Sequence, residues 1–241
     1  MKTIIALDFD TLEQSREFVS KLSAKNLENY AKEHNLKLIM PYLKVGMWQY
    51  YTAGNDFLKE LKDLGFNIFL DLKLIDIPNT IYNATKILLK NDIDILSLHS
   101  FAGEQALKAA VNAKNELGSK CELFGISVLT SFEEEEFKND LGFNGSINDC
   151  VKQRCLISKK AGLDGIVSSA YEAKFAKDLG LKALTPGIRF LGNDANDQAR
   201  VATPKFAIEN NIDYIVAGRM ITKSSNPIRA YFQCIKGEEN E

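Results

Sequence analysis

The segment of residues 71–80, DLKLIDIPNT, holds the side chains best suited to chemistry, because Asp71, Lys73 and Asp76 fall close together. The run NIFLDLK that contains the first two predicts a buried strand, and side chains alternate between the two faces of a strand. Asp71 and Lys73 therefore share one face, while the leucines pack on the other. Burying such charges is costly unless they are paired, so their presence indicates a catalytic or binding task. The alternative is a structural ion pair with a charged helix cap, since charge clusters also occur in structural networks.

Two further charged residues are expected to join this pair. Asp8 follows the apolar run that starts at Thr3, and Lys44 ends the short run of residues 41–45. In a parallel barrel the active site lies at the C-terminal ends of the strands. We therefore expect four charges from three successive strands to converge on one pocket.

A second group of residues has the chemistry of a phosphate site. TPGIR at residues 185–189 and AGR at 217–219 each place a glycine next to an arginine or two residues before one. Glycine lets backbone N–H groups approach an anion closely, and arginine adds a forked, permanently charged donor. One such pair predicts only a turn, but barrels often bind phosphate with the loops after strands 7 and 8. Two pairs at these loops therefore predict a phosphate site.

The polar segment between them, residues 190–200, predicts a mobile lid over the pocket, with Gln198 available to bind a ligand. The alternative is an ordinary surface loop.

Strand-like and helix-like segments alternate along the chain, which predicts an α/β fold with parallel strands and right-handed crossovers. The expected strands are residues 3–9, 41–45, 67–73, 93–99, 122–130, 165–169, 183–186 and 214–217. The expected helices are residues 12–22, 50–64, 79–89, 104–117, 146–161, 171–179, 204–210 and 227–235. Eight such units in this length predict a single (β/α)₈ TIM barrel with its active site at the C-terminal ends of the strands.

The composition is that of an ordinary globular protein and excludes several classes of partner. The chain has 241 residues, 45% hydrophobic and 26% charged, with a net charge of −2, which argues against nucleic-acid or membrane binding. The N-terminal apolar run is too short for a signal peptide, and no apolar stretch approaches the length of a membrane span. The four cysteines lack zinc-type spacing, so we expect reduced, buried thiols and a cytoplasmic location.

Taken together, these motifs resemble the orotidine 5′-phosphate decarboxylase family. The segment at residues 71–80 matches that family's signature of Asp-x-Lys-x-x-Asp followed, four residues after the second Asp, by Thr. The other matching segments are LDF at Asp8, KVG at Lys44, VLTS at residues 128–131, TPGIR at 185–189, Gln198, and GR at Gly218 and Arg219. The resemblance covers nearly the whole chain in the expected order.

The resemblance implies conversion of orotidine 5′-phosphate to UMP and CO₂, without metal or organic cofactor, in a homodimer. It implies that Lys73 protonates C6, that Asp71 sits beside the departing carboxylate, and that Lys44 links the ribose hydroxyls to the acidic network. It further implies that Asp76 and Thr80 reach across the dimer interface into the partner's pocket. The remaining implied substrate contacts are Asp8 on the ribose, Thr130 on the pyrimidine, Gln198 between base and phosphate, and Pro186, Arg189, Gly218 and Arg219 around the phosphate.

The chain departs from this family's pattern between Asp8 and Lys44, where it has surplus residues. We expect an insertion with helical character at residues 26–37, inside a single catalytic domain spanning 1–241 with a frayed tail at 237–241.

Three other functions remain to be compared. A decarboxylase or aldolase of the same barrel type, acting on a keto-sugar phosphate with Mg²⁺, would carry a glutamate where Lys44 stands. A Schiff-base aldolase would use Lys73 as nucleophile, but Asp71 and Asp76 would raise its pKa, which is unfavourable for an amine nucleophile. A non-catalytic phosphosugar-binding barrel would not need the full charged array. His99, at the end of the fourth expected strand, is interpreted as a supporting or core histidine.

Overall fold

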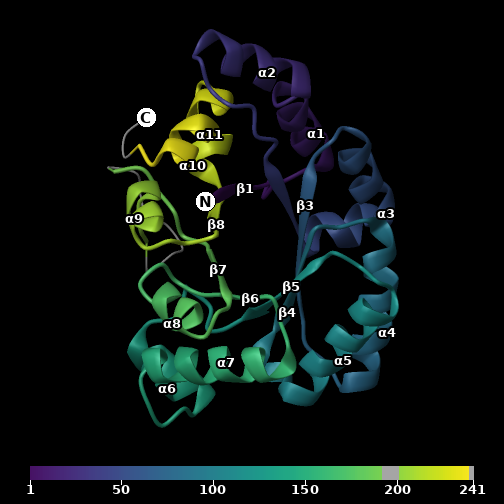
Figure 1. Ribbon diagram of the computed structural model, residues 1–241, viewed down its shortest axis with the longest axis vertical. Coiled ribbons are helices and arrows are strands. Elements are labelled where there is room, and N and C mark those ends of the chain that lie inside the picture. Colours follow the sequence, from purple (N-terminus) through teal and green to yellow (C-terminus); the bar gives the residue numbers. More distant parts are fainter. Residues whose placement is uncertain (192–200, 239–241) are drawn as a thin grey trace.

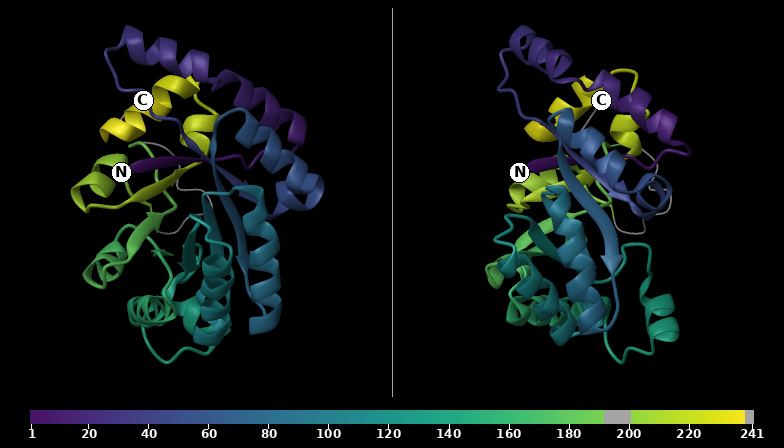
Figure 2. Two further views of the ribbon diagram at one scale, coloured as in Figure 1. Left: turned by 45° about the vertical axis from the view of Figure 1, so that its right-hand side comes forward. Right: turned by 90° about the vertical axis from the view of Figure 1, so that its right-hand side faces the viewer.

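The computed structural model describes residues 1–191 and 201–238 (Figures 1 and 2). Its eight strands are all parallel and close into a barrel in sequence order, which confirms the predicted (β/α)₈ fold. The strands are β1 (Lys2–Ala6), β2 (Tyr42–Gly46), β3 (Asn67–Leu74), β4 (Ile95–His99), β5 (Glu122–Ile126), β6 (Gly165–Val167), β7 (Lys182–Thr185) and β8 (Tyr214–Ala217).

The helices surround the barrel, as Figure 1 shows. They are α1 (Leu12–Lys21), α2 (Ala24–Glu33), α3 (Met47–Asp63), α4 (Pro78–Leu88), α5 (Glu104–Glu116), α6 (Glu134–Leu141), α7 (Ile147–Ala161), α8 (Ala173–Asp178), α9 (Pro204–Glu209), α10 (Arg219–Thr222) and α11 (Pro227–Lys236), with 3₁₀ turns η1 (Leu89–Asn91) and η2 (Ser100–Ala102). Among the described residues, no helix combines the length and the apolar character needed to cross a membrane.

Short-range signals place several of these helices. Thr11 and Gln14 form a reciprocal capping box at the start of α1, which fixes the first turn. Pro78 is the first residue of α4, where its missing N–H costs nothing. Gly162 ends α7 with a φ of 87°, a conformation that residues with a side chain rarely adopt.

Two apolar layers hold the barrel together. A small inner cluster fills the barrel, with Ile4, Phe69, Phe124 and Leu184 among its buried members. A much larger cluster lies between the strands and the surrounding helices. All four cysteines are free and buried, and burial raises the pKa of each thiol, that of Cys155 to about 12. They therefore serve packing, as the spacing predicts.

Helix α2 lies between α1 and β2, rather than in the first β–α connection, and was expected only as a helical extension at residues 26–37. Ser23 caps it, because its side chain accepts the Asn26 N–H. The helix packs on α11, where the rings of Tyr30 and Phe232 stack at 5.3 Å between centroids. Figures 1 and 2 show α2 outside the ring of helices, alongside α11.

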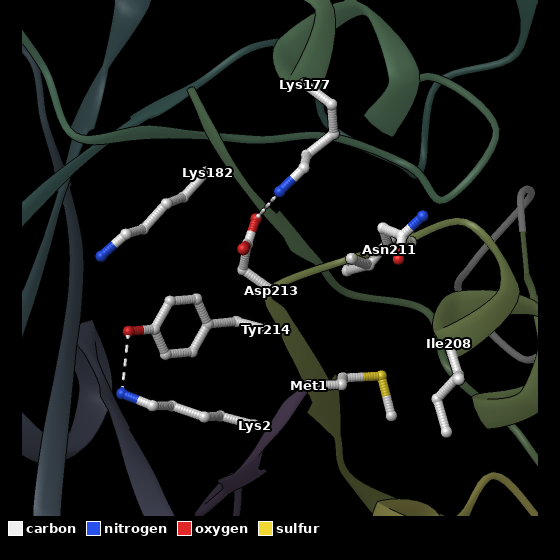
Figure 3. A pocket seen from close by; sticks show the side chains of 9 residues that line it. Met1, Lys2, Lys177, Lys182, Ile208, Asn211, Asp213 and Tyr214 are labelled. Atoms are coloured by element: carbon white, nitrogen blue, oxygen red, sulfur yellow. Dashed lines mark hydrogen bonds and ion pairs between the residues drawn. The ribbon is translucent and has the colours of Figure 1, made fainter. Parts of the chain in front are cut away.

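At the N-terminal end of the barrel, the aspartate just before each of β4, β6 and β8 joins neighbouring strands. Asp213 is one example: its N–H donates to the Ala183 carbonyl, and its carboxylate accepts the Ala183 N–H at 2.8 Å. The same carboxylate pairs with Lys177 at 2.8 Å (Figure 3). The Asp213 carbonyl accepts the N–H of Lys2 in β1.

Asp94 and Asp164 repeat this arrangement with Lys62 and Lys114. We call these three aspartate–lysine pairs the strand clamps. Pro41 occupies the equivalent place before β2 and has neither a carboxylate nor an N–H. Lys177 and Asp213 line a pocket at this end of the barrel, which Figure 3 shows.

Candidate active site

A cavity of about 860 Å³ opens at the C-terminal ends of the strands, where the barrel geometry places active sites. Ten of the residues singled out in the sequence line it: Asp8, Lys44, Asp71, Lys73, Thr130, Pro186, Gly187, Arg189, Gly218 and Arg219. Lining residues without a sequence signal include Phe69, Ser168 and Thr222. The predicted charges of β1, β2 and β3 thus meet in one place.

The four charges form a chain of alternating sign. The Lys44 ammonium lies 2.7 Å from Asp8 and 4.0 Å from Asp71, measured between nitrogen and carboxylate oxygen. The Lys73 ammonium lies 2.7 Å from the same oxygen of Asp71. Asp71 is 7% exposed, so it relies on these partners rather than on water.

Strand β3 reaches the cavity through a bulge. Leu70 pairs with Leu96 and Leu74 with Leu98, so that three residues of β3 lie opposite Ser97 alone in β4. Lys73 sits in this bulge with a φ of 49°, in the left-handed region. The expectation that Asp71 and Lys73 face the same cavity is met, but simple strand alternation is the wrong reason: the bulge directs Lys73 there.

Ser97 was not recognised as a site residue from the sequence. Its side chain is fully buried opposite the bulge. The hydroxyl donates to Asp71 Oδ1 at 2.8 Å and accepts the backbone N–H of Lys73 at 2.8 Å. The only sequence signal was its position two residues before His99 in the same expected strand, which places both side chains on one face of that strand.

Gln49, at the start of α3, ties the ends of β1 and β2 together. Its side-chain oxygen accepts the Gly46 N–H, and its amide nitrogen donates to the Leu7 carbonyl. A Cβ added at position 46 would stand 3.3 Å from Gln49 Oε1, which is closer than most such contacts. Gly46 therefore leaves room for the Gln49 side chain that joins the two strand ends.

The expected phosphate residues lie on the side of the cavity formed by β7 and β8. Gly187 has a φ of 75°, so glycine is required at that turn. The N–H of Arg189 donates to the Ala202 carbonyl, and the Ala202 N–H donates to the Gly187 carbonyl. These bonds join the two ends of the loop after β7. Gln198 and residues 192–200 of the lid expected at 190–200 lie outside the described residues.

Asp76 and Thr80 do not line the cavity of this chain. Both are exposed, and the Asp76 carboxylate accepts the N–H of the adjacent Ile77 at 2.7 Å. Ile75 and Ile77 are also exposed, at 58% and 66%. In a single chain, Asp76 and Thr80 therefore lie beside the cavity and not inside it.

His99 lies outside the cavity lining and next to Phe101, whose N–H its ring accepts at 3.4 Å. Burial, followed by the charges of Lys73 and Arg154, lowers the pKa of His99. The uncharged form is therefore favoured, in keeping with the interpretation as a supporting histidine.

Among the described residues that line the cavity, four are lysine or arginine and two are aspartate. This excess of positive charge favours an anionic ligand. The two sides of the cavity differ in the residues that line them. The β1–β3 side has an alternating lysine–aspartate array, whereas the β7–β8 side has arginines next to glycines. Together, the closed barrel and this cavity define a (β/α)₈-barrel enzyme.

Comparison with known proteins gives the family. The profile of the Orotidine 5′-phosphate decarboxylase / HUMPS family matches residues 1–234. The orotidine 5′-phosphate decarboxylase of Nautilia profundicola is 41% identical over 230 residues, covering 94% of each chain. That of Malacoplasma penetrans is 37% identical over 235 residues, covering 96% of each chain. The crystal structure of the Lactobacillus acidophilus orotidine 5′-phosphate decarboxylase superimposes with a TM-score of 0.82 at 33% identity, covering 98% of each chain.

The chain belongs to the Orotidine 5′-phosphate decarboxylase / HUMPS family, and it is a carboxy-lyase.

Proposed function

We propose that the protein converts orotidine 5′-phosphate to UMP and CO₂, the last step of de novo UMP synthesis, by direct decarboxylation without a metal ion. The observation that carries the proposal is the contact of 2.7 Å between the Lys73 ammonium and Asp71 inside a cavity with excess positive charge. An ammonium in this position is both a cation and a source of a proton.

The chemistry requires both properties of Lys73. When the bond between C6 and the carboxylate carbon breaks, CO₂ leaves and the electron pair stays on C6, with no conjugated electron sink to receive it. A fixed cation stabilises such a charge far better in a dry cavity than in water. Lys73 then transfers a proton from its ammonium to C6, which completes UMP.

Asp71 and its neighbours hold this cation in place and position the substrate. Asp71 lies beside the departing carboxylate, and Lys44 bridges Asp71 and Asp8. Asp8 binds the ribose, and Thr130, in the loop between β5 and α6, binds the pyrimidine edge. The charges are fixed before substrate arrives, so little reorganisation is needed during the reaction.

The arginine–glycine side of the cavity binds the 5′-phosphate. Arg189 and Arg219 supply charge, while Gly187 and Gly218 allow close approach and Pro186 completes the wall. Gln198 links base and phosphate from the loop after β7. Binding energy from this non-reacting group is available to organise the charged array.

The keto-sugar phosphate alternative with Mg²⁺ fits this cavity less well. Such a site needs carboxylates that are free to bind the metal. Here Asp8 and Asp71 each pair with a lysine, and Lys44 stands between them. An ammonium at that point repels a divalent cation.

We also propose that the active enzyme is a homodimer in which Asp76 and Thr80 enter the partner's cavity. Their position beside the cavity of their own chain supports this arrangement. Exposed Ile75 and Ile77 flank Asp76, and exposed Met47 and Trp48 follow the neighbouring strand β2. These side chains offer an apolar surface for the partner.

The proposal is tested by following the absorbance of orotidine 5′-phosphate after addition of EDTA-treated enzyme. Loss of the orotate absorbance, with UMP as the product, supports metal-free decarboxylation. Activity that appears only when Mg²⁺ is restored, or turnover of a keto-sugar phosphate instead, would contradict it.

A further inference from the structure

We propose that Ser97 is the positioning residue that sets the relative placement of Asp71 and Lys73 for the reaction. The inference rests on the proposed function for its kinetic consequence, but its structural basis is independent of the substrate. Ser97 does not line the cavity; it acts through Asp71 and Lys73, which do.

The three residues form a closed ring of contacts. The backbone N–H of Lys73 donates to Ser97 Oγ at 2.8 Å, and the Ser97 hydroxyl donates to Asp71 Oδ1 at 2.8 Å. The other oxygen of Asp71 accepts from the Lys73 ammonium at 2.7 Å. The Ser97 hydroxyl therefore contacts the backbone of Lys73 directly and acts on the Lys73 ammonium through Asp71.

The bulge in β3 explains why this hydroxyl is needed. Lys73 adopts a left-handed backbone conformation, which is unfavourable for a residue with a side chain and persists only where the surroundings enforce it. In the bulge, the ladder is interrupted between Leu70 and Leu74, so the Lys73 N–H needs another acceptor. Ser97 supplies it from the middle of β4.

A kinetic signature follows from where the substrate is held. The phosphate and ribose contacts expected to dominate binding lie on Arg219 and Asp8, which the ring does not include. Removing the Ser97 hydroxyl therefore disturbs the reacting groups while the binding groups stay in place. The loss should appear in kcat rather than in KM.

The experiment compares Ser97→Ala with the matched control Ser100→Ala. Ser100 is also fully buried and donates one hydrogen bond, to the Ile126 carbonyl at 2.6 Å, but it does not touch the charged array. We expect Ser97→Ala to lower kcat about 10- to 100-fold with KM changed less than about threefold. Ser100→Ala should leave both within about threefold of the parent.

Two further variants separate positioning from simple support of the fold. Ser97→Thr retains the hydroxyl and should restore kcat to within about fivefold of the parent. Ser97→Cys retains the volume with a weak donor, so it should lose kcat as Ser97→Ala does, and it carries the test if the alanine variant does not fold. A kcat close to the parent's in Ser97→Ala and Ser97→Cys overturns the proposal, as does an equal loss in Ser97→Thr or in Ser100→Ala.

A crystal structure of Ser97→Ala gives a second readout that needs no substrate. We expect the Lys73 ammonium to leave Asp71 or the bulge to change its backbone angles. An unchanged bulge and an unchanged contact between the two residues would overturn the positioning role. Absence of orotidine 5′-phosphate turnover in the parent protein would refute the proposed function alone, because the crystallographic result stands without it.

Discussion

At the residue scale, the proposed chemistry depends on where one ammonium group is held. Lys73 is fixed by Asp71 and by the bulge, and Lys44 compensates the remaining charge of the same carboxylate. At about 4 Å, two charges interact by roughly 4 kcal/mol at an effective dielectric of 20. Small displacements of these groups therefore change the stabilisation of the transition state substantially.

Replacing Lys73 by alanine removes both the cation and the proton source. We expect kcat for orotidine 5′-phosphate to fall by about a thousandfold or more, since both electrostatic stabilisation and general acid catalysis are lost. Binding of UMP, measured by calorimetry, should persist because the β7–β8 side is intact. A variant that retains more than about a tenth of the parent's kcat would exclude Lys73 as the essential acid.

Replacing Arg219 by alanine should affect only substrates that carry a phosphate. We expect kcat/KM for orotidine 5′-phosphate to fall about 100-fold or more, and kcat/KM for orotidine to change less than about threefold. Steady-state assays on the two substrates make the comparison. Equal losses on both would show that Arg219 supports the cavity in general and does not bind phosphate.

His99 should make the folded protein less stable in mild acid. Because burial lowers its pKa below 6.5, the unfolded chain binds the proton more readily. The stability is complete above the unfolded pKa and is lost as the pH falls through 6.5 towards the lower folded value.

Urea unfolding at pH 7 and pH 5 measures this effect. We expect the decrease in the free energy of unfolding to be smaller in His99→Gln than in the parent. His34→Gln, which replaces the only other histidine of the sequence, is the control and should show the parent's decrease. The same decrease in His99→Gln as in the parent would exclude His99 as its source.

At the element scale, the strand clamps join the N-terminal ends of alternate strands. Asp164 shows the pattern fully: it accepts the Leu123 N–H of β5 at 2.8 Å and pairs with Lys114 at 2.7 Å. Its carbonyl accepts the N–H of Lys182 in β7, so that one residue connects three neighbouring strands. These contacts hold neighbouring strands together and so help to close the barrel.

Asp164→Ala should therefore destabilise the fold more than an ordinary surface substitution. We expect the free energy of unfolding to fall by about 2–3 kcal/mol, because a backbone N–H and a lysine both lose their acceptor. Glu17→Ala, which breaks an exposed pair with Lys21 in α1, is the control and should cost less than about 0.5 kcal/mol. Equal losses in urea unfolding would mean that the clamp contributes little.

The strands and the main helix of each unit could be predicted from the sequence, because apolar runs and caps are short-range signals, whereas the short helices α6 and α10 were not among the expected segments. The eight strands were located, although β1 ends at Ala6 and β5 at Ile126, earlier than expected. The bulge at Lys73 could not be predicted, since no glycine or asparagine marks its left-handed backbone. The contacts of Ser97 and of the strand clamps join residues far apart in the chain, which no local pattern indicates.

At the scale of the whole molecule, the proposed homodimer predicts that one chain alone does not hold all the residues of the site. Asp76 lies just after β3 and Thr80 in the first turn of α4, yet both are exposed and do not line the cavity formed by the same chain. A second copy that covers Ile75 and Ile77 would bring these polar residues to its partner's site. Activity would then be a property of the pair.

Mixing two inactive variants tests this directly. Lys73→Ala and Asp76→Ala homodimers should each be inactive, but a mixed dimer holds one site with both native residues. If subunits exchange freely, half of the dimers are mixed and about a quarter of the parent's activity returns. The recovered activity is measured after unfolding and refolding the two variants together. Recovery that stays at the sum of the separate variants would place Asp76 in its own chain's site.

The strand clamps lie at the opposite end of the barrel from the lysine–aspartate array. The barrel therefore has one end where the clamps hold strands together and another end where the charged array lies. Side chains at the reactive rim are free to diversify over evolutionary time without loosening closure of the sheet. Because the two ends of the barrel serve different purposes, the same fold can acquire new substrates through changes at the C-terminal ends of its strands.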